Sequence, residues 1–299
     1  MRKSIVAVEK ASDRKQGVKS VLAAWGANPA RSQEVLIKPN FNTADPCPGS
    51  THNDTLAALI EELWAMGASA IRLGERSWQP TAQVMERKGV LPLLAKLGVE
   101  VIDFDRLPAE DWVLVSPPNS HWPQGFRVAR PVLESPCLVA TCCLKTHQYG
   151  GVFTLSLKLF VGALPNDRLG FPCMSHLHGS PHQRSMIAEI NQAFAPSLVL
   201  LDGVDAFVEG GPMTGRLVRA DMMAASSDRV ALDAVGVAAL RDLGSTREVM
   251  AGPIFGQEQI RRAVELGLGA AGPGQVELTA ANQPGREYAA RLRGLLDRS

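Results

Sequence analysis

Short apolar runs alternate with amphipathic stretches along the chain, and this rhythm limits the fold more than any other feature of the sequence. In the first third of the chain the apolar runs lie at 5–8, 35–38, 70–73 and 99–104, and stretches with helical spacing lie at 15–25, 54–66 and 84–97, the last with a predicted break near Gly89 and Pro92. Strands that alternate with helices predict an α/β fold with a mostly parallel sheet and helices on both faces.

The second half of the chain continues the pattern after one interruption. The proline-rich stretch 112–131 predicts a small β insertion, and the glycine-, proline- and histidine-rich stretch 162–180 predicts a long loop. Further strands are predicted at 137–141, 198–201 and 222–225, and helices at 180–194, 229–241, 257–266 and 284–297. A chain of 299 residues buries a substantial core, either as one domain over 1–299 or as two lobes, about 1–135 and 136–280, before the C-terminal helix.

Charge and apolar patterning bear on the partners of the protein. The 31 basic and 30 acidic residues give a net charge of +1, which provides no field for nucleic acid or for an anionic membrane. The apolar run near the N-terminus spans only four residues, and no run approaches the ~20 that a membrane helix needs, so we expect no signal peptide and no membrane span.

The cysteines bear on redox chemistry and compartment. Their number is five, and none stands in a C-x-x-C pair. We therefore expect free thiols, no iron–sulfur or zinc-ribbon motif, and a cytoplasmic protein, either monomeric or homo-oligomeric.

Lysine is scarce in this chain. Arginine outnumbers it by 22 to 9, and after Lys96 the only lysines are Lys145 and Lys158. Lysine can lose its proton or form an imine, whereas arginine cannot, so the two late lysines are either chance survivors or residues kept for lysine chemistry.

Ligands of open parallel sheets bind at the carboxyl ends of the strands. We predict that the strands at 35–38, 137–141 and 198–201 point their carboxyl ends into one crevice, because a polar loop that contains glycine follows each of them. The segment after 35–38 ends in a Gly/Ser/Thr-rich loop that opens a helix, so it either binds an anion or simply caps that helix. Its candidate binding residues are Lys38, Asn40, Thr51 and His52.

The segment after 137–141 is the most unusual in the chain, because Lys145, His147 and a glycine pair lie between a buried strand and a short helix that begins near Thr154. We predict His147, Lys158 and His178 as catalytic groups and Lys145, Gly150, Gly151 and Gly211 as further binding residues. A polar turn with solvated lysines is the alternative.

Histidines and carboxylates suggest a second kind of chemistry. His176 and His178 form an H-x-H pair, which points to one side if the segment is extended. Asp202 and Glu209 follow the predicted strand at 198–201. Imidazole and carboxylate are metal ligands as well as acid–base groups, so these four residues are candidates for a divalent-metal site, with capping and solvated roles as the alternative.

Several short motifs together resemble the bacterial and archaeal family called domain of unknown function 362. They are Leu36-Ile37-Lys38-Pro39-Asn40, Leu144-Lys145-Thr146-His147, Ser156-Leu157-Lys158, Asp202-Gly203, Glu209-Gly210-Gly211-Pro212 with Gly215, and Ala224-Ala225-Ser226-Ser227-Asp228 with Ala231-Leu232-Asp233-Ala234. The resemblance implies a fold and a site without a settled reaction. Many relatives carry ferredoxin-like cysteine clusters, which this sequence lacks.

His147, Lys158 and His176 or His178 also resemble, in order and spacing, residues of the nickel-pincer lactate racemases. In that family the lysine is tied to the pincer cofactor, and the histidines bind nickel or move the substrate proton. The resemblance stops at Gly74-Glu75-Arg76, which lacks the histidine found there in the racemases.

Two functional hypotheses follow from the sequence. The first is an enzyme, isomerase-like by that analogy, that acts on a small organic carboxylate or phosphate with lysine and histidine acid–base chemistry and either a divalent metal or a metal–organic cofactor. The second is a non-catalytic carrier that uses the same crevice for a metal, a cofactor or a redox partner.

Overall fold

The computed structural model describes residues 3–298. The strands are β1 (Ser4–Lys10), β2 (Glu34–Lys38), β3 (Ala70–Glu75), β4 (Glu100–Asp103), β5 (Trp112–Val115), β6 (Phe126–Ala129), β7 (Cys137–His147), β8 (Val152–Phe153), β9 (Leu198–Gly210), β10 (Gly215–Ser226) and β11 (Val276–Thr279). The helices are α1 (Arg14–Trp25), α2 (Asn53–Ala65), α3 (Thr81–Arg87), α4 (Val90–Lys96), α5 (Arg130–Leu133), α6 (Leu155–Leu159), α7 (Cys173–Gly179), α8 (Gln183–Ile190), α9 (Arg229–Asp242), α10 (Arg247–Met250), α11 (Glu258–Glu265) and α12 (Gln283–Asp297).

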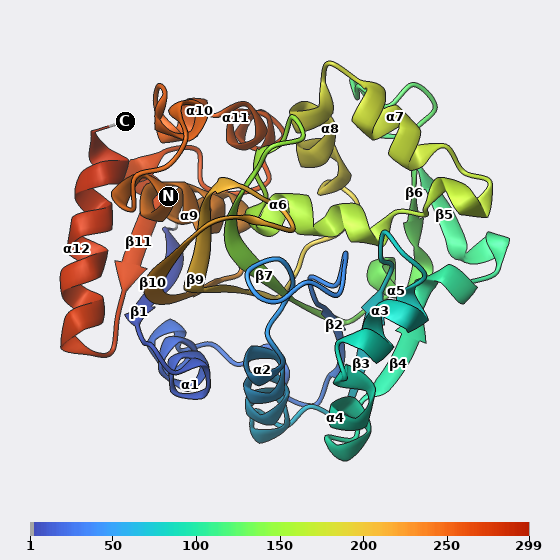
Figure 1. Cartoon of the computed structure of the whole chain (residues 1–299), viewed down its shortest axis with the longest axis horizontal. Coiled ribbons are helices and arrows are strands. Elements are labelled where there is room, and N and C mark those ends of the chain that lie inside the picture. Colours follow the sequence, from blue (N-terminus) through green and yellow to red (C-terminus); the bar gives the residue numbers. More distant parts are fainter. Residues whose placement is uncertain (1–2, 299) are drawn as a thin grey trace.

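One large sheet runs through the molecule in the order β11-β1-β10-β9-β7-β2-β3-β4 (Figure 1). Neighbouring strands pair in parallel from β9 to β4, and β1 pairs in parallel with β11; β10 is antiparallel to both of its neighbours, β1 and β9. The short strand β8 pairs with the end of β7. The fold is therefore α/β with a mostly parallel sheet, as predicted.

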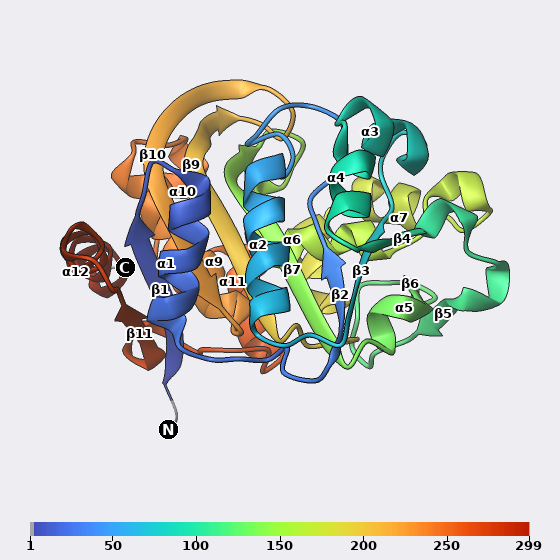
Figure 2. The same ribbon diagram turned by 90° about the horizontal axis from the view of Figure 1, so that it is seen from below.

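Helices cover both faces of this sheet, with α1, α2 and α4 on one side and α6, α9 and α11 on the other (Figures 1 and 2). The central strand β7 shows why: Leu138, Ala140 and Leu144 belong to one hydrophobic core, while Val139 belongs to the other. Side chains alternate between the two faces of a strand, so a strand that is buried on both faces reads as the continuous apolar run seen in the sequence.

Local sequence signals fix the ends of the longer helices. The side chains of Asp13, Asp228 and Asn282 accept backbone N–H groups at the starts of α1, α9 and α12. Such caps satisfy amides that the first helical turn leaves without partners. The predicted break in 84–97 occurs at Gly89, which has a φ of 61° and separates α3 from α4.

The small β insertion is confirmed, because β5 and β6 form a separate antiparallel pair. Three predictions about elements were wrong. Strand β7 continues to His147, and β9 passes through Asp202-Gly203 to form a long antiparallel hairpin with β10. Part of the predicted loop 162–180 is the helix α7, and β11 was not predicted.

The strands of the large sheet come from both of the predicted lobes, since β2, β3 and β4 pair onward to β7 and β9. Within residues 3–298, no helix has the length and apolar character to cross a bilayer.

Candidate functional site

Strands β2, β7 and β9 run in parallel and end at the same edge of the sheet, as predicted. A cavity of about 1240 Å³ lies at this edge. Residues that end or follow β2, β3 and β7 line it, among them Lys38, Glu75 and Lys145, together with α6 and the segment around α7 and α8. This is the position where open α/β sheets place their ligands.

Lys145 and Lys158 bring two positive charges to this cavity. Lys145 is 2% exposed, and its Nζ donates to the carbonyl oxygen of Gly49 at 2.6 Å. Lys158 lies in α6, which begins just after Thr154 as predicted, and among residues 3–298 its ammonium has neither a hydrogen-bond acceptor nor a carboxylate partner. Burial and the charges of Lys145 and Arg76 lower the pKa of Lys158 to about 8.

Two histidines line the same cavity. His147 is 7% exposed, and its Nδ1 is buried without a hydrogen-bond partner in the described part of the chain. Burial, followed by the charges of Lys158, Lys145 and His178, lowers the pKa of His147 to about 2. His178 contacts Gln183 Nε2 through Nδ1 at 2.9 Å, and burial and Lys158 lower its pKa as well. Both rings are therefore neutral near pH 7.

A buried ion pair forms part of the cavity wall. Lys38 Nζ lies 2.5 Å from Glu75 Oε1, and both side chains are almost fully buried. Because Glu75 neutralises Lys38, this lysine offers less free charge to a ligand than Lys145 and Lys158. Beside the pair, Arg76 donates to the carbonyl oxygens of Val161 and Leu164 at 2.9 Å, which holds the segment after α6 against β3.

Several residues that line the cavity were not predicted from the sequence. Glu75 and Arg76 follow β3 directly, and the strand-end rule applied to that strand would have found them. Arg168, Arg184, Trp78 and Tyr149 also line the cavity. Trp78 and Tyr149 are each 55% exposed, so two aromatic rings accompany the cationic groups.

A buried carboxylate, that of Asp233, fixes the position of α6, the helix that carries Lys158. Asp233 in α9 accepts the backbone N–H of Ser156 at 2.7 Å and that of Leu157 at 3.3 Å, and also the hydroxyl of Ser156. Burial raises the pKa of Asp233 to about 7, against the opposing effect of these hydrogen bonds. Asp228 caps the start of α9, whereas Asp233 lies further along that helix and fixes the start of α6.

The predicted binding residues divide into two groups. Lys38, Asn40, Lys145 and Gly150 line the cavity, but Thr51, His52, Gly151 and Gly211 are not part of its lining. Thr51 Oγ1 accepts the backbone N–H of Asn40 at 2.9 Å, and His52 Nδ1 accepts that of Asp54 at the start of α2. These two side chains therefore shape the loop and cap the helix, which was the alternative interpretation of this segment.

Two of the predicted glycines are needed for close packing. A Cβ atom on Gly151 would lie 2.8 Å from His147 Nδ1 and 3.2 Å from Lys158 Cε. A Cβ atom on Gly211, whose φ is 69°, would lie 2.1 Å from the carbonyl oxygen of Thr146. Gly151 thus lets the histidine and the lysine come together, whereas Gly211 lets the β9–β10 turn lie against β7.

The four candidate metal ligands do not come together. His176 and His178 lie in a helix and not in an extended segment, so they leave it in different directions, and only His178 lines the cavity. Glu209 is exposed and pairs with Arg216. Among residues 3–298 no three His, Cys, Asp or Glu side chains form a group that would hold a metal ion.

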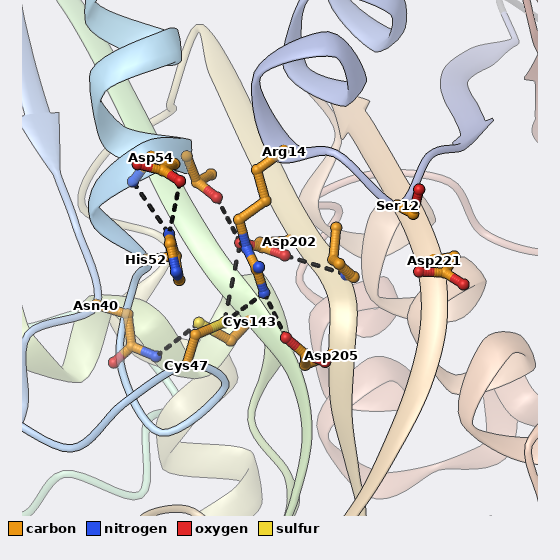
Figure 3. A network of polar contacts seen from close by, with 12 residues as sticks. Ser12, Arg14, Asn40, Cys47, His52, Asp54, Cys143, Asp202, Asp205 and Asp221 are labelled. Carbon is orange, nitrogen blue, oxygen red and sulfur yellow. Dashed lines mark hydrogen bonds and ion pairs between the residues drawn. The ribbon is translucent and has the colours of Figure 1, made fainter.

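Asp202 belongs to a separate buried network, shown in Figure 3. Its Oδ2 accepts from Arg14 Nε at 3.0 Å and from Thr55 Oγ1 at 2.5 Å, and Arg14 also contacts Asp205 at 2.7 Å. An arginine 188 positions earlier in the chain thus neutralises the predicted metal ligand. Because Arg14 and Thr55 already donate to the Asp202 carboxylate, this side chain does not need to reach solvent, and β9 continues through it.

Comparison with known proteins places the chain in a family. It is 26% identical over 204 residues to the thylakoid-associated protein sll1697 of Synechocystis sp., a match that covers 67% of this chain and 61% of that protein, so the chain spans less than two thirds of this relative. The solved lactate racemase apoprotein from Thermoanaerobacterium thermosaccharolyticum is similar with a TM-score of 0.47 and 16% identity, over 76% of this chain and 55% of that one. Residues 35–238 match the family described as Domain of unknown function (DUF362), and since this match covers more than half of the chain, the protein belongs to that family.

Proposed function

We propose that the protein is an enzyme that binds a small organic carboxylate or phosphate in the cavity and moves a proton on it with Lys158, His147 and His178. The observation that carries this proposal is the ammonium of Lys158 beside Nδ1 of His147, neither with a partner among residues 3–298, in a cavity at the carboxyl edge of the sheet. A buried polar atom normally has a partner, so His147 Nδ1, together with the ammonium beside it, is a candidate for ligand contact.

The charges around the cavity favour an anion. Glu75, Asp105 and Glu258 neutralise Lys38, Arg168 and Arg184, respectively. No carboxylate among the described residues forms an ion pair with Lys145 or Lys158. An anionic group bound between these two lysines would supply the missing negative charge and would raise the pKa of both.

The lowered pKa of Lys158 suits proton transfer. A lysine with a pKa near 8 is partly neutral at physiological pH and can accept a proton, as a lysine with its ordinary pKa of 10.5 cannot. Neutral His147 and His178 can donate to or accept from the same ligand, while Lys145 stabilises the negative charge that develops on it. We infer that the reaction removes or adds a proton at a carbon next to the anionic group.

The donor side chains at the cavity determine whether the protein could hold a metal or a metal–organic cofactor. A metal ion held by protein side chains alone needs three or four donors, and the described residues do not gather three. His147 and His178 are the only imidazoles among the described residues that line the cavity. The residues therefore do not fit a metal site made by the protein alone, and no step of the proposed reaction is assigned to a metal.

A thermal-shift screen of the full chain against small mono- and dicarboxylates and phosphates tests binding. We expect some of these anions to stabilise the protein, and Lys158→Met to abolish that stabilisation. Lys96→Met is the matched control, because Lys96 lies at the end of α4 and is not part of the cavity lining. No stabilisation by any anion would contradict the binding part of the proposal.

Solvent exchange then tests the chemistry. Each anion that binds is incubated with the protein in D₂O, and mass spectrometry follows deuterium uptake at carbon. We expect uptake with the wild-type protein and none with Lys158→Met. Binding without any uptake would contradict an enzyme and would favour the carrier, the alternative function that the sequence left open.

A further inference from the structure

We propose that Cys47 and Cys143 form a redox-active dithiol, which hydrogen peroxide oxidises to a disulfide. Cys47 lies in the loop between β2 and α2, and Cys143 lies on β7. The two thiols share a hydrogen bond, and Figure 3 shows the two cysteines side by side. Neither cysteine is part of the cavity lining, so the site is distinct from the lysine–histidine site.

Polar groups surround this pair. Arg14 Nη2 donates to Cys47 Sγ at 3.4 Å, and Asn40 Nδ2 donates to Cys143 Sγ at 3.7 Å. The charges of Lys145 and Lys88 also act on the two sulfurs, while Asp202 Oδ2 lies 3.9 Å from Cys47 Sγ. Cationic and amide donors around a sulfur stabilise a thiolate, which is the reactive form of cysteine.

The remaining cysteines lack such an environment. Burial raises the pKa of Cys137, Cys142 and Cys173. In the pair, by contrast, the hydrogen bond between the two thiols raises the pKa of Cys47, as burial also does, and lowers the pKa of Cys143, with help from Lys145 and against the effect of burial, so the shared proton rests on Cys47. The pair therefore shares one proton and loses the other more readily than an isolated buried thiol would.

Exposure determines the order of the steps. Cys47 is partly exposed, whereas Cys143 is only 1% exposed. A small oxidant therefore reaches Cys47 first, and passage of the shared proton to Cys143 makes Cys47 the thiolate. Cys143 lies directly behind it, within hydrogen-bond distance, as the resolving thiol.

The reaction with hydrogen peroxide balances in two steps. The Cys47 thiolate attacks one oxygen of the peroxide, the O–O bond breaks, and the departing hydroxide takes up a proton to give water and a sulfenic acid on Cys47. Cys143 then attacks Cys47 Sγ as a thiolate, the S–O bond breaks, and the second hydroxide leaves as water with the remaining thiol proton. The two thiols thus give two electrons to one peroxide and become a disulfide.

The full-length protein tests this proposal. It is treated with a small excess of hydrogen peroxide, quenched with catalase, alkylated and digested without reduction. We expect a linked peptide pair that contains Cys47 and Cys143 and a fall from five free thiols to three in the unfolded protein, reversed by dithiothreitol. In Cys143→Ser we expect no link and a Cys47 sulfenic acid that dimedone traps, whereas the control Cys173→Ser keeps the link.

If Cys143→Ser fails to fold, Cys47→Ser replaces it, and we expect its four remaining thiols to resist the same peroxide treatment. The proposal is overturned if the wild-type protein keeps all five thiols, if Cys47 advances to the sulfinic acid without a link, or if the link joins another pair of cysteines.

Discussion

Asp233 Oδ1 accepts the backbone N–H of Ser156 at 2.7 Å, across the 77 positions that separate them in the sequence. Asp233 lies in the long buried helix α9, and Ser156 lies two residues before Lys158 in the short helix α6. A helix of five residues gains little stability from its own hydrogen bonds. The position of Lys158 therefore depends on a carboxylate in the core, which ties the site to the stability of the fold.

This contact predicts a pH dependence of stability. Burial raises the pKa of Asp233 from 3.8 to about 7, so its neutral form is favoured in the folded protein, and the stability it contributes is lost as the pH rises through about 7. Asp233→Asn cannot titrate. Urea denaturation gives the unfolding free energy of both proteins. We expect the value for wild type minus the value for Asp233→Asn to decrease between pH 4 and pH 8. A difference that is constant or grows with pH would contradict this account.

Lys158→Met removes a charge that the fold disfavours. Because the pKa of Lys158 is lowered to about 8, its charge is unfavourable below pH 8, and the penalty disappears as the pH rises to 10.5. We expect the ligand-free variant to gain roughly 1–2 kcal/mol at pH 7, after allowance for solvent screening, and to lose that gain near pH 10.5. Urea denaturation at both pH values measures it, and a variant that unfolds at pH 7 would show that Lys158 has a structural role.

Gly151→Ala tests the close approach of His147 and Lys158. The added methyl group would lie 2.8 Å from His147 Nδ1, so we expect a loss of about 1–3 kcal/mol and a change in the pKa of Lys158. Gly294→Ala is the matched control, because its Cβ meets no described atom within 4 Å and it lies inside the helix α12. That variant should gain about 0.5–1 kcal/mol. Equal effects of the two substitutions would contradict the packing seen at Gly151.

Asp202→Ala distinguishes a structural carboxylate from a metal ligand. It removes the carboxylate that accepts from Arg14 at 3.0 Å and from Thr55, while Arg14 keeps Asp205, so we expect a loss of about 1–3 kcal/mol in stability. Glu34→Ala, which removes an exposed partner of Arg72, should change stability by less than about 0.5 kcal/mol. If Asp202→Ala instead keeps its stability and loses a bound divalent metal, the structural assignment fails.

Much of the fold could be predicted because its signals are local. Short stretches of sequence determine the apolar periods of β2, β7 and α2, the break at Gly89 and the β insertion. The rule that ligands bind at strand ends then led from these elements to the segment around Lys145 and Lys158. The family was also recognisable from its short motifs.

The errors arose where a polar residue finds its partner far away in the chain. Lys145 and Thr146 look like loop residues, yet they end a strand because the Gly49 and Phe207 carbonyls accept their hydrogen bonds. Asp202 looks like a turn or a metal ligand until Arg14 is seen beside it. Likewise, the geometry of His176 and His178 depended on whether their segment is extended or helical, which a glycine- and proline-rich sequence does not reveal.

The pKa of Lys158, measured with and without a bound anion, reports whether this lysine holds an anionic ligand in the cavity. Competitive labelling of the lysines with trace acetic anhydride across a pH series, followed by mass spectrometry of the peptides, gives this value in the full-length protein. We predict a midpoint near 8 without ligand, and a higher one with whichever carboxylate or phosphate stabilises the protein in the thermal screen. A midpoint near the ordinary value of 10.5 that does not change with that anion would contradict the account.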